Sequence, residues 1–244
     1  MSSPYLEKFD AAPGNREAAY AELYDAFHID DREVNKLPSK RRRRRIALYQ
    51  SIIGKGHTQI LEIGCGLGDL TLGLAGNSNR VIGVDVSAKV IEIAKKRAEK
   101  LRLQEAGEVE FHRMGATDIK YDGESFDWVI STSMIEHLHP DDIQPHLVEV
   151  FRVLRKGGRY LVWAPNGLGH HGDRDMHLSM LSHSDLVAEM KRAGFRSFET
   201  TLFNSPKLIH VRWKIFLENW FSALGIKWFW SHLGIRNLLL VAEK

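Results

Sequence analysis

Residues 59–71 read QILEIGCGLGDLT, a short apolar run followed by glycines at every second position, with one acidic residue inside the run. An apolar strand that ends in a glycine-rich loop and continues as a helix brings backbone N–H groups close to a ligand. Most such loops hold phosphate, which a neighbouring carboxylate would repel. The position of Glu62, two residues before Gly64, therefore predicts a ligand with a cationic group.

The spacing of the glycines argues against a dinucleotide. The dinucleotide fingerprint is G-x-G-x-x-G, which would require glycine where Asp69 stands. The next apolar run, residues 80–85, ends in Asp85, where a carboxylate can accept hydrogen bonds from both hydroxyls of a ribose. The bland alternative, a plain strand-to-helix turn, does not explain both Glu62 and Asp85. The two runs together predict a site for a cationic nucleoside.

Runs rich in Val and Ile alternate with helical patterns, which predicts a parallel sheet covered by helices on both faces. The expected strands are residues 59–63, 80–85, 109–114, 126–132 and 159–165. Helices are expected from Asp69, after the capping Ser87, and from Pro140 as far as Gly157. In such a sheet the ligand lies at the carboxyl ends of the strands.

The chain divides into an N-terminal extension and one larger domain. Residues 1–38 are polar and irregular apart from one helical pattern, and the domain covers residues 39–244. Residues 164–182 include a His- and Gly-rich loop, expected to face the substrate. Residues 205–235 form an aromatic-rich insertion that is too long for a hairpin turn. The final residues, LLLVAEK, are expected to form the last strand.

Composition and charge exclude several classes of protein. The 34 basic and 31 acidic residues give a net charge of +3, which is too small to predict DNA or RNA binding by itself. The single cysteine, Cys65, cannot form an intrachain disulfide, and residues 1–30 show no signal-peptide pattern. These features predict a cytoplasmic protein. An uninterrupted apolar stretch of about 18 residues, as a membrane span needs, is not found in the sequence.

Four motifs, in this order and spacing, resemble the class I S-adenosylmethionine-dependent methyltransferases: LEIGCGLG, VIGVDVS, FDWVIS and LRKGGRYLVWAPN. The likeness covers residues 40–204 and the final strand. The stretch SMIEHLH, after the fourth strand, is similar to the small-molecule branch of ubiquinone and menaquinone methyltransferases. The resemblance implies an α/β fold with a Rossmann-like, doubly wound sheet of seven strands. That sheet is mostly parallel, and its antiparallel last strand lies before strand six. S-adenosylmethionine is then the expected cofactor.

The resemblance also assigns roles to residues. The acid of the glycine motif accompanies the methionine part of the cofactor, Asp85 holds the ribose, and an arginine near Arg44 approaches the cofactor carboxylate. The family usually has an acid where this chain has Gly115, so the backbone of the next two residues is expected to contact the adenine. The expected cofactor-binding residues are Arg44, Glu62, Gly64, Gly66, Asp85, Val86, Ala116, Thr117, Ser131 and Met134.

Methyl transfer to a hydroxyl requires a base, and histidine is the side chain best matched to neutral pH. His137 follows the fourth strand on the ligand side of the sheet, although EHLHP equally fits a helix cap. The expected acid–base residues are His137, His170, His171 and Asp173. The loop GHHGDRDMH could hold a metal, but it lacks the i, i+4 spacing of a preformed helical site, so no metal is expected.

Two further features leave the acceptor open. The run Arg41–Arg45 fits a solvated helix face, or alternatively a grip on RNA or anionic lipid. Residues 205–235 fit core, a homodimer contact, or a surface for an apolar acceptor or a membrane. The sequence thus predicts methyl transfer to O or N of a small, apolar or polar, organic acceptor. The alternatives are a non-catalytic S-adenosylmethionine-binding protein, and an RNA or protein methyltransferase that uses the arginine run.

Overall fold

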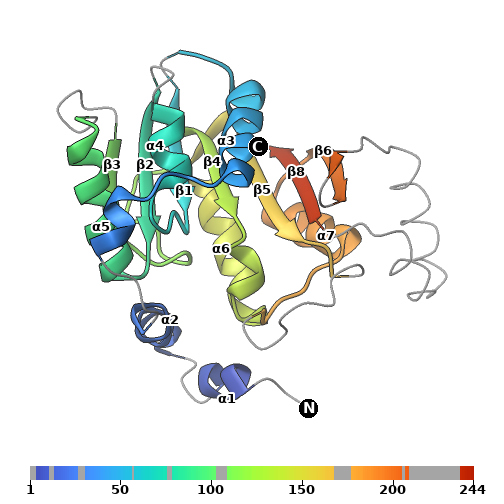
Figure 1. The fold of residues 1–244 in the computed structure, drawn as a ribbon. Coiled ribbons are helices and arrows are strands. Elements are labelled where there is room, and N and C mark those ends of the chain that lie inside the picture. Colours follow the sequence, from blue (N-terminus) through green and yellow to red (C-terminus); the bar gives the residue numbers. More distant parts are fainter. Residues whose placement is uncertain are drawn as a thin grey trace.

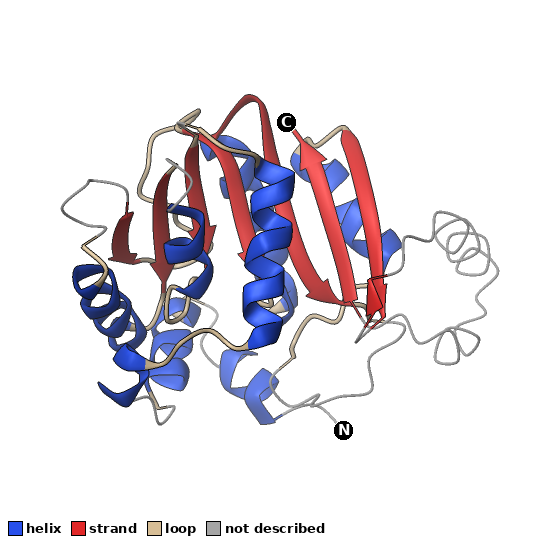
Figure 2. Cartoon of the chain, turned by 45° about the horizontal axis from the view of Figure 1, so that its top comes forward, coloured by secondary structure: helices blue, strands red, loops and turns tan. Residues whose placement is uncertain are grey.

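The structure is a computed structural model, which describes residues 4–10, 14–26, 31–56, 58–75, 79–102, 109–167, 177–204, 207–208 and 237–244. A single mixed sheet runs through the domain, with helices on both of its faces (Figures 1 and 2). The strand order is β3-β2-β1-β4-β5-β8-β6-β7. The described residues therefore form the doubly wound α/β fold that the sequence predicts.

The strands agree closely with the apolar runs of the sequence. They are β1 (Gln59–Ile63), β2 (Arg80–Asp85), β3 (Val109–Arg113), β4 (Phe126–Thr132), β5 (Leu154–Pro165), β6 (Ser197–Asn204), β7 (Lys207–Leu208) and β8 (Asn237–Glu243). The first five are mutually parallel, and β8 lies between β5 and β6, antiparallel to both. The predicted place of the last strand is confirmed. The two-residue β7 adds an eighth strand within the range predicted as an insertion.

The helices cover the sheet and the edge where its parallel strands end. They are α1 (Pro4–Asp10), α2 (Arg16–Asp25), α3 (Lys40–Ile53), α4 (Asp69–Ala75), α5 (Ala88–Lys100), α6 (Pro140–Val153) and α7 (His183–Ala193), with the short 3₁₀ helices η1 (Asp31–Asn35) and η2 (Ile135–His137). None of the helices in the described ranges combines the length and the apolar character that crossing a membrane requires.

The alternation of side chains along each strand divides the core into two parts. In β1, Leu61 and Ile63 belong to the apolar cluster that includes Leu147 of α6, whereas Ile60 belongs to the cluster that includes Tyr49 of α3. All five side chains are almost fully buried. Because both faces of the strand are apolar and covered, the ends of the strands are the surface that remains for a ligand.

The boundary between α6 and β5 differs from the prediction. The helix ends at Val153, and β5 begins at the next residue, several positions before the glycines that were expected to end the helix. Between its pairings with Phe126 and Trp128, β5 shifts register from Leu154 to Arg159. Gly157, with φ of 73°, lies in this irregular stretch. Gly157 therefore marks an interruption in strand β5 and not the end of helix α6.

The N-terminal segment is more ordered and more closely packed than the sequence suggests. Helix α1 was not predicted, yet Phe9 is fully buried, with its ring centroid 4.4 Å from that of Tyr20. In α2 the buried residues are Ala19, Tyr20 and Ala21. In Figure 1 both helices lie beyond the end of the sheet, and residues of α2 line the larger cavity together with residues that follow β1 and β2.

Candidate functional site

Two adjoining cavities lie at the carboxyl ends of the parallel strands, around the loop between β1 and α4. The larger measures about 770 Å³ and the smaller about 510 Å³. Both are lined by Gly64 and Gly66 of the loop and by Ser133, which follows β4. The sheet edge that the sequence predicts for ligand binding is therefore hollowed on both sides of the glycine loop.

The backbone of the glycine loop is fixed by contacts with β2 and with the segment after β4. The N–H groups of Gly64 and Cys65 both donate to the carbonyl oxygen of Val84, over 2.8 and 3.0 Å. Gly64 has φ of +72°, and a Cβ atom there would lie 2.5 Å from Cγ of Met134. Position 64 therefore requires glycine for its conformation and for this close approach. Burial raises the pKa of the Cys65 thiol, which favours a packing role over a nucleophilic one.

Residues expected around the nucleoside line the larger cavity. One carboxylate oxygen of Asp85 accepts the N–H of Gly66 over 2.9 Å, and the other accepts the N–H of Ser87 over 3.0 Å. These bonds orient the carboxylate and leave a lone pair on each oxygen for a ligand. The lining of the larger cavity also includes Val86, Ala116, Thr117 and Met134.

Helix α2 forms a wall of the larger cavity, which the sequence did not predict. Nη2 of Arg16 donates to the carboxylate of Asp142 in α6 over 2.7 Å, and the hydroxyl of Tyr20 donates to the same carboxylate over 3.0 Å. At the other end of α2, the hydroxyl of Ser87 donates to Asp25. Because contacts at both ends hold α2 against the domain, its side chains have defined positions in the cavity wall.

Glu17 of α2 extends to the loop that follows β3. A Cβ atom built on Gly115 would lie 2.6 Å from Oε2 of Glu17. The Glu17 carboxylate thus occupies the position that a side chain at residue 115 would take. Within the described part of the chain, this carboxylate takes part in no hydrogen bond or ion pair. The larger cavity therefore has an available acceptor at this point, although the sequence offers no acid at residue 115.

The smaller cavity contains Glu62, whose side chain is almost completely buried. The hydroxyl of Thr71 in α4 donates to the Glu62 carboxyl group. Burial raises the pKa of Glu62 to about 8, and the nearby negative charges of Asp69 and Asp85 act in the same direction. Among the described residues, no ion pair neutralises Glu62. A cation entering the smaller cavity would therefore relieve an unfavourable buried carboxylate.

The arginines that line the smaller cavity are Arg41, Arg42 and Arg45, whereas the expected Arg44 is not among them. Each residue of an α-helix is rotated by roughly 100° from the one before it, so Arg44 projects about a quarter turn away from the face that these three share. Arg44 is exposed, whereas Arg45 is partly buried, with its guanidinium 4.6 Å from the ring centroid of Trp163. Burial lowers the pKa of Arg45.

Ser131, which was expected beside the methionine part of the cofactor, is fully buried and is not among the residues that line either cavity. Its Oγ is 2.5 Å from the hydroxyl of Tyr160, which is 3.1 Å from Nε2 of His146. Nδ1 of His146 lies 2.9 Å from the carbonyl oxygen of Ala116.

The direction of these hydrogen bonds follows from the charge of His146. Burial lowers its pKa to about 4, so the imidazole is neutral and carries one proton. A carbonyl can only accept, so Nδ1 donates to Ala116, Nε2 accepts from Tyr160, and the Tyr160 hydroxyl accepts from Ser131. Ser131 therefore belongs to a buried chain of hydrogen bonds that holds the loop of Ala116 in place.

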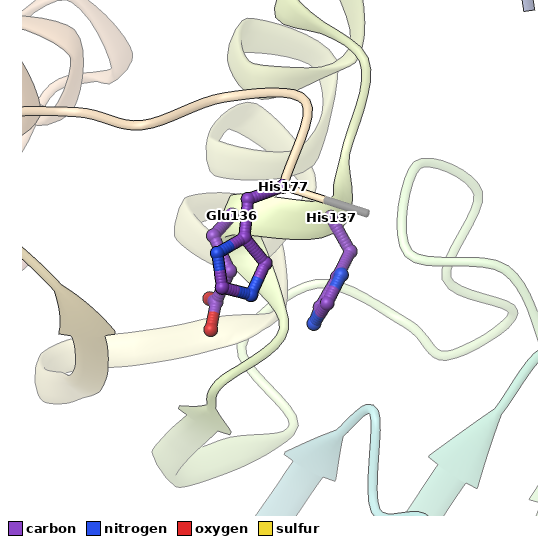
Figure 3. Close-up of side chains that lie close together, drawn as sticks. All are labelled: Glu136, His137 and His177. Atoms are coloured by element: carbon purple, nitrogen blue, oxygen red, sulfur yellow. The ribbon is translucent and has the colours of Figure 1, made fainter. Parts of the chain in front are cut away.

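His137 lines the larger cavity and lies beside Glu136 and His177 (Figure 3). Its ring centroid is 5.9 Å from that of Tyr24 and 5.0 Å from that of His177. Glu136 is buried, and burial raises its pKa to about 7. The sequence did not associate Glu136 with this site, because it offers no signal that residues 136 and 177 meet. The other expected acid–base residues, His170, His171 and Asp173, lie outside the described residues.

Comparisons with known proteins agree with this geometry. Residues 60–158 match the family model described as a methyltransferase domain. An uncharacterized methyltransferase of Anoxybacillus flavithermus is 21% identical over 215 residues, which cover 85% of this chain and 83% of that protein. A demethylmenaquinone methyltransferase of Leptospira interrogans is 35% identical over 109 residues, which cover 43% of this chain and 42% of the relative. The match to this second relative thus spans less than half of its length.

The fold is also found in solved structures. One is phosphoethanolamine N-methyltransferase 2 of Haemonchus contortus in complex with S-adenosyl-L-methionine. It superposes with a TM-score of 0.68 at 17% sequence identity, over 92% of this chain and 60% of that chain. At this level of identity the superposition establishes a shared fold alone. The resemblance seen in the sequence motifs is confirmed by the methyltransferase-domain match and by the sequence relatives.

Proposed function

We propose that this chain, which contains an S-adenosylmethionine-dependent methyltransferase domain, transfers a methyl group to an oxygen or nitrogen atom of a small organic acceptor. The observation that carries the proposal is the pair of cavities that meet at the glycine loop. One is lined by the fixed carboxylate of Asp85 and the other by Glu62 and Arg45. This arrangement suits a nucleoside joined to an amino acid.

The residues of the larger cavity fit the nucleoside part of S-adenosylmethionine. Asp85 has one free lone pair on each oxygen for the ribose hydroxyls, and Val86 offers an apolar contact to the adenine. Glu17 lies beside Gly115, where it can accept a hydrogen bond from the exocyclic amine of the adenine. The backbone of Ala116 and Thr117 completes this part of the proposed site.

The residues of the smaller cavity fit the methionine part. Glu62 is a buried carboxyl group whose pKa is raised to about 8, so the approach of an ammonium group favours its ionised form. Arg45 is a partly buried cation, and no described carboxylate forms an ion pair with it, so it is available for the ligand carboxylate. Arg42 is already paired with Asp69 over 2.6 Å. We therefore assign the carboxylate contact to Arg45.

When bound, S-adenosylmethionine supplies a methyl group that the positive charge of its sulfonium has already activated. The protein must then align the acceptor and exclude water. Helix α2 serves the second purpose, since Arg16 and Tyr20 hold it against Asp142 while its inner face lines the larger cavity. His137 lines the same cavity, where a neutral imidazole can remove the proton of an acceptor hydroxyl or amine.

The same geometry bears on the alternative acceptors. Arg41, Arg42 and Arg45 line the smaller cavity, so most of the arginine run has a place in the proposed cofactor site. RNA binding is therefore not needed to explain why the run is there. We also propose that residues 164–182 contribute to the acceptor site through His170, His171 or Asp173, and that residues 205–235 contribute an apolar lid. Contact of residues 205–235 with a membrane or with a second copy of the chain is a further proposal.

Calorimetry with S-adenosylhomocysteine, the product that cannot react further, tests the cofactor site. Replacing Arg45 by alanine should weaken binding by roughly tenfold or more, because a charge-assisted hydrogen bond contributes about 1.5–3 kcal/mol. Arg44→Ala removes the same charge from the same helix and should leave the affinity within about twofold. Equal effects of the two variants would refute the role of Arg45. Failure of the folded wild-type protein to bind S-adenosylhomocysteine and S-adenosylmethionine would refute the proposed function.

A further inference from the structure

Three potential metal ligands meet beside the larger cavity. Glu136 and His137 lie in η2, and His177 lies in the segment before α7 (Figure 3). One ligand atom of each side chain lies within 4.8 Å of the ligand atoms of the other two. Ligands of one octahedral ion lie about 3–4 Å apart when the metal–ligand distance is near 2.1 Å. Small side-chain rotations would therefore bring all three atoms onto one ion.

Glu136 provides an independent sign that a partner belongs here. Its side chain is 3% exposed, and its Oε2 atom is buried without a hydrogen-bond partner in the described part of the chain. A buried carboxylate oxygen without a partner costs free energy unless a cation or a donor occupies the adjacent space. Figure 3 shows the Glu136 carboxylate and the two imidazole rings on the same side of η2, close to one another.

We propose that Glu136, His137 and His177 bind one divalent transition-metal ion next to the cofactor cavity. Two imidazoles and one carboxylate suit zinc, manganese or iron(II), whereas magnesium prefers oxygen ligands alone. Three protein ligands leave coordination positions for water or for a substrate atom. The sequence predicted no metal, because the loop around His177 lacks the ligand spacing of a helical metal site. The proposed site differs because it combines His177 with two ligands from η2, a separate segment.

The metal site specifies the acceptor more narrowly, and in this respect it rests on the proposed function. His137 lines the larger cavity, so an ion bound to it lies at the edge of the space where the acceptor must enter. A hydroxyl group coordinated to a divalent ion loses its proton to water at a much lower pH than a free hydroxyl. The inferred acceptor is therefore an oxygen nucleophile, and His137 acts as a ligand of the ion instead of as the base.

The test measures metal binding directly, without turnover. Full-length protein is stripped with a chelator and dialysed, and then titrated separately with Zn²⁺, Mn²⁺ and Mg²⁺ by calorimetry. We expect one Zn²⁺ or Mn²⁺ per chain and no measurable Mg²⁺ binding. Glu136→Gln and His177→Ala should each raise the Zn²⁺ dissociation constant by more than about 100-fold, since loss of even an outer-shell partner commonly costs 10–100-fold.

His112→Ala is the matched control, because His112 is an exposed imidazole 3.1 Å from a carboxylate oxygen of Glu110. It should leave the Zn²⁺ affinity within about twofold. Wild-type protein without stoichiometric Zn²⁺ or Mn²⁺ binding overturns the proposal, and so do equal affinities in wild type and His177→Ala. If Glu136→Gln fails to fold, His177→Ala decides alone. S-adenosylhomocysteine binding by the same samples separates this outcome from failure of the proposed function.

Discussion

Glu17 gives the sharpest test of how the adenine is recognised. Its carboxylate lies where a side chain at residue 115 would begin, 2.6 Å from the position of a Cβ atom on Gly115. An acid contributed by α2 would thus take the place of the acid that the family resemblance leads one to expect at residue 115. Two variants and their combination examine this replacement: Glu17→Ala, Gly115→Asp and the double substitution.

The expected magnitudes follow from the contacts. A hydrogen bond to a carboxylate contributes about 1.5–3 kcal/mol, and the exposed position of Glu17 favours the lower end, so Glu17→Ala should weaken S-adenosylhomocysteine binding roughly tenfold. Gly115→Asp alone should also weaken binding, because its Cβ collides with Glu17 and adds a like charge. Gly115 does not have a positive φ, so aspartate can adopt the same backbone conformation at this position without strain. The double variant should therefore recover most of the lost affinity.

Calorimetry with two ligands completes the design. S-adenosylhomocysteine carries the exocyclic amine, whereas S-inosylhomocysteine carries a carbonyl oxygen in its place and cannot donate to Glu17. Glu17→Ala should weaken binding of the first ligand and leave binding of the second unchanged or stronger. Equal losses for both ligands would show that Glu17 acts only by holding α2 in place. Failure of the double variant to exceed Glu17→Ala in affinity would also refute the reasoning.

Three further predictions concern stability. The folded-state pKa of Glu62, about 8, exceeds its unfolded value, so the wild-type protein loses stability as the pH rises towards 8. Glutamine does not titrate and avoids this loss. Glu62→Gln should therefore raise the melting temperature of the ligand-free protein by about 5 °C more at pH 8.5 than at pH 6. A pH-independent effect would contradict this. Tyr160→Phe should cost about 1–3 kcal/mol in urea unfolding, because Nε2 of His146 loses its donor, and a change below about 0.5 kcal/mol would exclude that bond. Arg16→Ala should lower the melting temperature by several degrees, since it leaves the buried Asp142 without its cation, and an unaltered transition would show that the pair contributes nothing.

The sheet could be predicted because its signals are local. The strands β1, β2 and β4 are runs of five to seven mostly apolar residues, whereas β3 carries only Val109 and Phe111 as buried apolar residues. The start of β5 was missed because Gly157 has the same conformational preference in a helix end and in an interrupted strand. The resemblance to a known family, and not the apolar pattern, placed β8 between β5 and β6.

The location of the candidate site follows from the sheet. Asp85 and the glycine loop come directly after parallel strands, so topology alone brings them to one edge. The wall formed by α2 was missed because it depends on contacts between distant parts of the chain, such as that of Arg16 with Asp142, 126 positions away. The weakly amphipathic pattern of α2 does not reveal which of its polar residues, Glu17 among them, face a cavity.

A difference of one or two residues has different consequences in helices and strands. Arg44 and Arg45 differ in direction by roughly 100°, and Arg45 lines the smaller cavity whereas Arg44 is exposed. Ser131 and Ser133 bracket the end of β4, yet the first is in the core and only the second lines the cavities. Strand ends therefore predict the location of a site better than they predict its individual side chains.

The paired arginines and the unpaired acids around the glycine loop favour a cationic group in the ligand, while Arg45 stays as an unpaired cation among the described residues of the smaller cavity. Arg16, Arg42 and the guanidinium of Arg97 are engaged by carboxylates of the protein. In the described residues, Glu17 and Glu62 have no such partner. S-adenosylmethionine brings the positive charge of its sulfonium close to these acids, whereas the sulfur of S-adenosylhomocysteine is neutral. The product therefore lacks only this attraction to the sulfonium and keeps the proposed contacts with Glu17 and Glu62 that both ligands share.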